Sequence, residues 1–169
     1  MAATIESVNA PSSTGGYLNL YSNGGAPGTS TTGTDTAGVN GTVWIGAINI
    51  PRETNITGIS FLVGATGVTD KVIVMLFNSA GALVANSAVA GTQIGTAATM
   101  QRVPFTAQYG AAPGLYFVGV QTNGNTSTIR TQVFGDHPTA SISQTFGTPV
   151  AITPPTTFTT NYAPYCMLY

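Results

Sequence analysis

Residues 71–87 read KVIVMLFNSAGALVANS, and this stretch decides the fold. An apolar run, residues 72–77, leads into Asn78, Ser79, Ala80 and Gly81, after which a second apolar run begins. Asparagine at the start of a turn and glycine at a position with positive φ are typical of a type I turn with a bulge, which predicts a β-hairpin. Because residues 72–77 contain no polar position, both faces of their strand should be covered, as in a central strand or one that lies under a partner.

Runs of β-branched and aromatic residues recur along the middle of the chain and are separated by Gly, Asn and Pro. No stretch has a sustained i, i+3, i+4 apolar pattern, so we expect very little helix. The predicted strands are residues 42–50, 55–63, 71–77, 82–87, 100–105, 115–121 and 126–134. This spacing is typical of an all-β protein, an antiparallel β-sandwich or barrel.

The two ends of the chain differ from this middle part. Residues 22–41 are full of turn-forming residues, which predicts a long loop or mobile arm, and residues 17–21 before it could form a short strand. We therefore divide the chain into an N-terminal arm with a Gly/Thr-rich loop, residues 1–41, and a β-sandwich domain, residues 42–169. Residues 135–169 are rich in proline and should be largely extended. Because the sequence finishes on YCMLY, we expect that end to be docked in a sheet or an interface.

Charged residues are rare, at 5% of positions against about 25% in an average soluble domain. The formal net charge is -1 and the mean hydropathy is +0.24, which favours a folded domain over a disordered one. A nearly neutral protein has little repulsion between its copies, so we expect a free monomer to associate. The 4 basic residues form no cluster, which argues against nucleic-acid binding.

The N-terminal residues 1–13 have neither a basic region nor an apolar run of the secretory type, and no apolar run approaches the roughly 20 residues of a membrane span. We therefore expect a protein that is made in the cytoplasm and has no membrane anchor of its own. The single cysteine, Cys166, excludes an internal disulfide and a multi-cysteine zinc site, and we expect it to be a small buried hydrophobe. No calcium-loop or phosphate-loop motif is present, so we predict no metal or cofactor, with a calcium ion on backbone carbonyls left open.

Few side chains could carry chemistry. The acidic residues are Glu6, Asp35, Glu53, Asp70 and Asp136. A glycosidase-like site would need two of them to converge, and we interpret Glu53 and Asp70, each next to a basic residue, as solvated charges at strand ends. His137 follows Asp136 in a turn and could act as a base with that carboxylate, but adjacent turn residues seldom point toward a common site. We therefore predict a protein without catalytic residues.

Aromatic rings are the remaining candidates for recognition, because they anchor protein interfaces and stack on sugars. We expect Trp44 to lie in the core rather than to form an exposed platform. The predicted interface residues are Tyr17, Tyr21, Phe158, Tyr162, Tyr165 and Tyr169. For the last four, packing between subunits is the favoured role, and packing within the chain or stacking on a glycan are the alternatives.

Two segments, VIVMLFNSAGALVA (72–85) and APGLYFVGVQ (112–121), resemble a pattern found in jelly-roll β-sandwich modules. In that pattern a strand, an N/D-S-x-G turn and a second strand are followed downstream by a P-G-x-Y-x-V strand entry. Similar modules occur in virion proteins of tailed bacteriophages, including head decoration proteins and fibre heads, and in bacterial carbohydrate-binding and secreted-protease C-terminal domains. The resemblance covers about residues 55–134.

The resemblance implies a jelly-roll-like sandwich. Because the bacterial modules are usually secreted and often hold calcium with clustered acids, it favours a virion structural protein, namely a non-enzymatic capsid decoration or cement protein that stabilises a viral shell. Its expected partners are copies of itself, by analogy in a homotrimer, and the major capsid or other virion proteins. The alternatives are a glycan- or receptor-binding module of a phage tail fibre or spike and, less favoured, an enzyme domain in which His137 and a carboxylate line one pocket.

Overall fold

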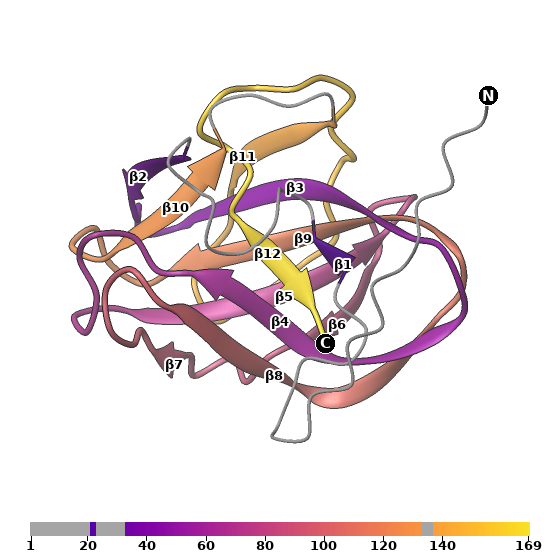
Figure 1. Cartoon of the computed structure of the whole chain (residues 1–169), viewed down its shortest axis with the longest axis horizontal. Coiled ribbons are helices and arrows are strands. Elements are labelled where there is room, and N and C mark those ends of the chain that lie inside the picture. Colours follow the sequence, from indigo (N-terminus) through magenta and orange to yellow (C-terminus); the bar gives the residue numbers. More distant parts are fainter. Residues whose placement is uncertain (1–20, 23–32, 133–136) are drawn as a thin grey trace.

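The computed structural model describes residues 21–22, 33–132 and 137–169, and of residues 21–22 only the backbone. Within these ranges the chain forms strands, turns and loops and no helix (Figure 1), which confirms the all-β prediction. The strands are β1 (Tyr21–Ser22), β2 (Gly33–Ala37), β3 (Thr42–Ile50), β4 (Thr54–Leu62), β5 (Lys71–Asn78), β6 (Leu83–Asn86), β7 (Thr92–Gln93), β8 (Met100–Ala111), β9 (Gly114–Thr122), β10 (Thr128–Gln132), β11 (Thr139–Ser143) and β12 (Cys166–Leu168).

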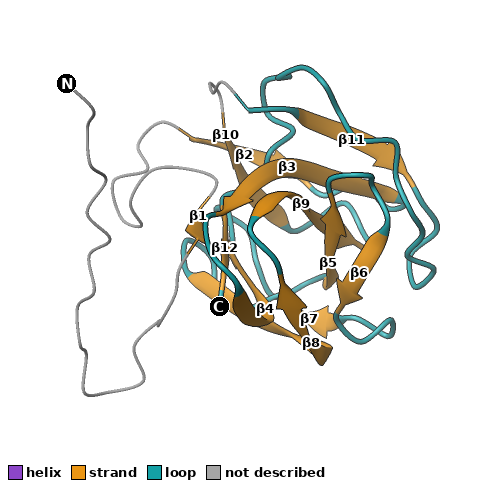
Figure 2. Cartoon of the chain, turned by 90° about the vertical axis from the view of Figure 1, so that its right-hand side faces the viewer, coloured by secondary structure: helices purple, strands orange, loops and turns teal. Residues whose placement is uncertain are grey.

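The described strands pair antiparallel in three sheets. The smaller of the two main sheets has the order β1-β12-β4-β8, and the larger has the order β11-β3-β9-β5-β6, with β7 also paired to β5. Strands β10 and β2 form a separate two-stranded sheet. Figure 2 shows the main sheets as two layers, with β3, β9 and β5 in one and β4 and β8 in the other. This arrangement is compatible with the predicted β-sandwich.

The apolar strand β5 lies between β9 and β6 in the larger sheet. Every second side chain, starting from Val72, belongs to the core between the two main sheets. The alternate set, starting from Ile73, belongs to a second apolar cluster on the opposite face. All six side chains are fully buried, so the prediction that both faces of this strand are covered is confirmed.

The turn after β5 is the predicted hairpin. The Asn78 side chain accepts hydrogen bonds from the backbone N–H groups of Ala80 and Ala82, each at 3.0 Å. The Gly81 N–H donates to the Asn78 carbonyl at 2.9 Å, and Gly81 has φ +81, a conformation that suits glycine. The register shifts between Leu76 and Phe77, so the bulge is present as well.

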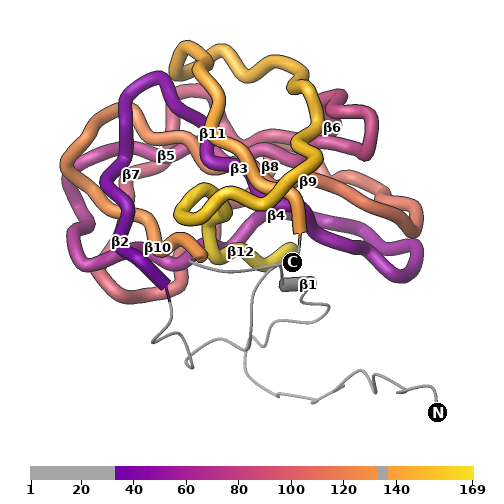
Figure 3. The backbone as a smooth tube through the Cα atoms, turned by 90° about the horizontal axis from the view of Figure 1, so that it is seen from above, coloured from indigo at the N-terminus to yellow at the C-terminus, as the bar shows by residue number. Residues whose placement is uncertain are grey.

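The second apolar cluster is covered by the chain that follows β11. Phe146 and Ile152 pack against residues of β3, β5 and β9, and the β11 side chains Ala140 and Ile142 join them. Figure 3 shows this C-terminal segment, in orange and yellow, running across the molecule as seen from above. The proline-rich segment therefore closes the outer face of the larger sheet, which explains how a strand apolar on both faces can be stable.

The structure differs from the sequence prediction mainly within residues 22–41. The predicted loop contains β2, whose residues pair in full register with β10. Strand β8 continues past the predicted end at Phe105, and its ladder with β4 is interrupted between Ile56 and Gly58 by extra residues of β8. Strand β10 is shorter than predicted at its start, while Phe134, at its predicted end, lies outside the described residues together with residues 1–20.

The last residues of the sequence are docked in a sheet, which is one of the two predicted alternatives, a sheet or an interface. Strand β12 pairs with β4, with Cys166 opposite Phe61 and Leu168 opposite Ile59. Cys166 and Leu168 belong to the core between the sheets. The buried position of Cys166 confirms the prediction for the single thiol, and burial raises the pKa of that thiol.

Candidate functional site

The predicted interface residue Tyr169 is held by backbone contacts with the middle of β4. Its carbonyl oxygen accepts hydrogen bonds from the N–H of Thr57 at 2.6 Å, the N–H of Gly58 at 3.2 Å and the Thr57 hydroxyl at 3.0 Å. The guanidinium carbon of Arg102 lies 3.9 Å from the centre of the Tyr169 ring, a cation–π geometry. The half-buried ring therefore packs within its own chain, although its remaining surface is exposed.

Two other predicted interface residues also pack on their own chain. The Tyr162 ring lies 5.6 Å from Trp44, centre to centre, and Phe158 lies 6.2 Å from His137 in an edge-to-face arrangement. Trp44 is 7% exposed and belongs to the core, which confirms its prediction. Its indole N–H has no hydrogen-bond partner among the described residues. Tyr162 and Phe158 each keep part of their surface in solvent, so an additional contact with another molecule stays a prediction.

The remaining predicted interface residue with a described side chain is Tyr165, which lies near Gly33 of β2 together with Arg130 of β10. A Cβ atom on Gly33 would lie 2.9 Å from both Cγ of Arg130 and Cε2 of Tyr165. The stem of Arg130 and the tyrosine ring therefore both lie against the bare backbone of β2. Tyr17 lies outside the described residues, and the side chain of Tyr21 is likewise not described.

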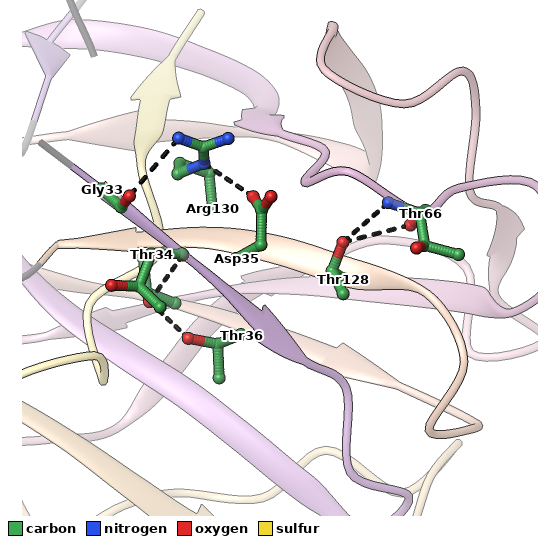
Figure 4. A network of polar contacts seen from close by, with 8 residues as sticks. Gly33, Thr34, Asp35, Thr36, Thr66, Thr128 and Arg130 are labelled. Carbon is green, nitrogen blue, oxygen red and sulfur yellow. Dashed lines mark hydrogen bonds and ion pairs between the residues drawn. The ribbon is translucent and has the colours of Figure 1, made fainter. Parts of the chain in front are cut away.

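Arg130 of β10 and Asp35 of β2 form the ion pair of this region, drawn in Figure 4. Arg130 Nε donates to Asp35 Oδ1 at 2.7 Å, and Arg130 Nη1 lies 3.4 Å from the Gly33 carbonyl. The two side chains are 21% and 27% exposed, so the pair is neither free in solvent nor fully buried. Because the residues face each other in the β2–β10 ladder, the pair also fixes the register of that sheet.

Threonine hydroxyls lie on both faces of the β2–β10 ladder, one set near the ion pair and one on the opposite face. Thr128 Oγ1 accepts a hydrogen bond from the Thr66 N–H at 2.9 Å, and Thr36 and Thr131 share one at 2.6 Å between their hydroxyl oxygens. We call the exposed and partly exposed residues on the Arg130 side the Arg130 patch: Asp35, Thr66, Thr128, Arg130 and Tyr165. It combines a carboxylate, a guanidinium, hydroxyls and one ring, which is the chemistry of hydrogen bonding to a polar ligand rather than of proton transfer.

Asp70 is a second carboxylate with a specific role, and the interpretation of it as a solvated charge is wrong. It is 8% exposed, and its Oδ2 accepts the N–H groups of Thr126 at 3.0 Å and Ser127 at 2.6 Å. In return, the backbone N–H of Asp70 donates to the Ser127 hydroxyl oxygen at 3.1 Å. Asp70 therefore anchors the turn between β9 and β10, whereas Glu53 is exposed as predicted.

No group of three or more His, Cys, Asp or Glu side chains that could hold a metal ion occurs within the described residues. Asp136, the possible partner of His137, lies outside those residues, so that pair stays untested. None of the described segments is a helix with the length and hydropathy of a membrane span.

The chain was compared with protein-family models, with curated protein sequences and with solved structures, and none of these comparisons gave a match. The functional argument therefore rests on the residues themselves. Sequence reasoning missed the Arg130 patch because Asp35 and Arg130 are separated by 95 positions and the β2–β10 pairing has no local signal. It missed the role of Asp70 because a carboxylate that binds backbone N–H groups resembles any loop acid in sequence.

Proposed function

We propose that the protein is a non-enzymatic structural component of a viral particle, a capsid decoration or cement protein that stabilises the shell through contacts between subunits. The observation that carries this proposal is how little free charge the described surface offers. Asp35 pairs with Arg130 and Asp70 binds backbone N–H groups, so both acids already have partners within the chain. A surface of hydroxyls, amides and scattered apolar groups can be buried against a neighbour without the large cost of desolvating charge.

The exposed part of the surface fits this role. The exposed charged residues of the described ranges are Arg52, Glu53, Lys71 and Arg102. The exposed large apolar residues are Val39, Val68, Val89, Leu115 and Val150. The apolar residues are distributed over loops and strand ends rather than along one strand, and so they suit several small contacts with neighbours on a lattice better than one large groove.

A jelly-roll-like topology is part of the proposal. It is supported by the ends of two strand ladders that follow each other along the chain. The β3–β9 ladder ends where Ile50 pairs with Gly114, and the β4–β8 ladder begins where Thr54 pairs with Ala111. The short links 51–53 and 112–113 thus pass from one main sheet to the other side by side. A jelly roll has this feature, because it forms when a long antiparallel pair of strands folds over into two sheets. By analogy with such modules we propose a trimer that is bound to major capsid proteins, located in the virion.

Purified particles provide the test. We expect mass spectrometry to detect the protein in particles washed at high salt, and particles that lack it should release their contents at a lower temperature. Adding back the recombinant protein should restore the release temperature, and an unrelated β-sandwich protein is the control. Absence of the protein from washed particles, or unchanged particle stability without it, would contradict the proposal.

A second candidate, a glycan- or receptor-binding module of a tail fibre or spike, is favoured by the Arg130 patch. Its carboxylate, guanidinium and hydroxyls lie beside the Tyr165 ring, and sugars are recognised by such hydrogen-bonding groups together with a ring. A glycan array would test it. Specific binding that Thr66→Ala and Asp35→Asn abolish, and that Thr145→Ala at an exposed position elsewhere leaves unchanged, would support a glycan module; no binding would exclude it in favour of the structural role.

A further inference from the structure

The edges of the main sheets are not equally covered. On one side, β6 of the larger sheet meets β8 of the smaller: Ser87, next to β6, pairs with Phe105 in an isolated bridge, and the Thr106 hydroxyl donates to the Asn86 carbonyl at 3.1 Å. These two edges therefore cover each other. On the other side, the larger sheet ends at β11, which pairs with β3 alone. Figure 2 shows β11 at the outer margin of its layer.

Two hydrogen bonds fix which backbone groups of β11 face away from β3. The Ala47 N–H donates to the Pro138 carbonyl at 3.0 Å, and the Gln144 N–H donates to the Gly41 carbonyl at 2.8 Å. Residues 138, 140, 142 and 144 therefore bond toward β3, because backbone groups in an antiparallel ladder alternate in direction. Thr139, Ser141 and Ser143 bond outward.

Only the first of these outward-facing residues has a backbone partner within the described part of the chain. The Thr139 N–H donates to the Thr157 carbonyl at 2.9 Å. The Thr139 hydroxyl donates to the carbonyl of Thr159, in the same segment, also at 2.9 Å. For Ser141 and Ser143 no backbone partner occurs among the described residues. Their N–H and C=O groups are thus an open edge of two donors and two acceptors.

This edge lacks the features by which proteins usually prevent edge pairing. Natural edge strands are protected by charged side chains, proline or a bulge. Strand β11 contains no proline, its ladder with β3 has no register shift, and residues 137–169 include no Asp, Glu, Lys or Arg. Two copies of the edge can therefore approach each other without repulsion between like charges.

We propose that β11 pairs antiparallel with β11 of a second copy of this chain, about a two-fold axis at Ile142. Ser141 of each copy then lies opposite Ser143 of the other, and each such pair exchanges two N–H to C=O hydrogen bonds. The open groups are self-complementary, because the same two donors and two acceptors recur in reverse order on the second copy. The contact joins two larger sheets into one, and it does not depend on a role in a viral particle.

The pairing should be weak in free solution. Each new hydrogen bond replaces bonds to water and therefore contributes little net free energy, so four of them barely offset the translational and rotational freedom lost on association. Val150, 51% exposed and held beside the end of β11 by the Gln144 side chain, adds apolar surface at this margin. The contact is therefore best detected by covalent trapping or when copies are held close together.

Cysteine cross-linking of the full chain provides the test, because the native thiol Cys166 is buried. Ser141→Cys protein is mixed with Ser143→Cys protein under mild oxidation. Opposite residues in the proposed register have Cα atoms about 5.5 Å apart, within disulfide range, whereas two copies of position 141 are offset by two residues, beyond the roughly 7 Å limit. We expect the mixed disulfide to exceed either homodimer by about tenfold, a preference equivalent to about 1.4 kcal/mol.

Further variants control for chance collisions. Thr145→Cys, exposed but outside the strand, should give little cross-linked dimer with itself. Ser143→Lys added to the Ser141→Cys protein should lower its trapping with Ser143→Cys protein about tenfold, while Thr145→Lys added to the same protein should not. Thermal unfolding confirms that each variant is folded. Equal yields of mixed and homodimeric disulfides, or no mixed disulfide from folded protein, would overturn the proposal, and neither result would bear on the particle experiment above.

Discussion

At the scale of single residues, the position of Tyr169 depends on a glycine in the neighbouring strand. The Tyr169 N–H donates to the Gly58 carbonyl at 3.2 Å, and the Gly58 N–H donates to the Tyr169 carbonyl at the same distance. A Cβ atom on Gly58 would collide with the Tyr169 hydroxyl and would lie 2.5 Å from the Val103 carbonyl oxygen. Because that carbonyl belongs to the backbone of β8, a side chain there could be accommodated only by moving a strand.

Gly58→Ala should therefore destabilise the protein by about 1–3 kcal/mol, the usual cost of overpacking, as measured by chemical denaturation. Gly110→Ala is the matched control: Gly110 also lies in a strand, but the nearest atom to its Cβ would be Asn55 Oδ1 at 3.7 Å. We expect no loss of stability in the control. Equal stability of the two variants would show that Tyr169 does not pack over Gly58 in solution.

A second residue-scale prediction concerns pH. Burial raises the pKa of the Cys166 thiol above its ordinary value of 9.0. When the pH rises above about 9, the thiol ionises in the unfolded chain before it does so in the folded protein, so the unfolded state is favoured. The free energy of unfolding should be insensitive to this group below that pH and should fall above it, by up to about 1.4 kcal/mol per pH unit.

The measurement is urea denaturation at a series of pH values up to 10, with Cys166→Ala for comparison. The variant will be less stable at every pH because it leaves a cavity, so the slopes are compared and not the absolute values. Restriction to pH 10 is needed because burial and the neighbouring Tyr116 raise the pKa of Tyr109, whose ionisation would act in the same direction at higher pH. Identical slopes for the two proteins would contradict a buried neutral thiol.

At the scale of strands and segments, the accuracy of the sequence predictions depended on whether the signal was local. Strand β3 has the predicted bounds, and the hairpin after β5 forms around Asn78 and Gly81, because alternation, apolar runs and turn residues are properties of adjacent positions. Strand β2 was missed: its sequence GTDTA contains no large apolar residue, and it is stabilised by pairing with β10. A strand that depends on a distant partner cannot be recognised from its own composition.

The candidate site illustrates the same limit. The aromatic residues near the end of the sequence were predicted to pack between subunits, and that role stays a prediction. Within the chain Tyr162 contacts Trp44 and Tyr169 contacts Arg102, neighbours that the sequence could not name. Those neighbours come from β3 and β8, far away in sequence. The apolar sequence of β5 predicted that another segment covers its outer face. It did not predict that residues 144–152 form this cover, because an extended proline-rich chain has no periodicity that indicates burial.

The cover formed by this segment leads to a prediction at the same scale. Ile152 is 7% exposed and packs in the second apolar cluster, and its N–H donates to the Gly81 carbonyl at 2.9 Å. Ile152→Ala should cost about 2–5 kcal/mol through lost burial and a residual cavity. Val150→Ala, in the same segment but 51% exposed, should change stability by less than about 0.5 kcal/mol.

Chemical denaturation of both variants would test whether the segment is part of the folded core. Similar small effects at the two positions would mean that the segment lies loosely over the sheet. In that case Phe77 and the other buried side chains on this face would lack their main cover, which would be difficult to reconcile with a stable strand that is apolar on both sides.

At the scale of the whole molecule, the two apolar clusters share their strands. Alternate residues of β3, β5 and β9 belong to the core between the main sheets and to the cluster beneath the C-terminal segment. Neither cluster can be lost while the other keeps its geometry, because every one of these strands contributes side chains to both. The ends of the described sequence add to this coupling, since β12 pairs with β4 and β2 pairs with β10.

Unfolding should therefore be a single cooperative transition even though the molecule contains two clusters. Trp44, the only tryptophan, reports on the core between the sheets, and far-ultraviolet circular dichroism reports on all strands. We expect both signals to change at the same urea concentration, and Ile152→Ala, which lies in the other cluster, to shift both midpoints equally. If the circular dichroism of that variant decreased at a lower urea concentration than its tryptophan signal, the outer cluster would unfold independently. The larger sheet would then be supported on its inner face alone, and pairing through β11 would have to take place on a partly mobile edge.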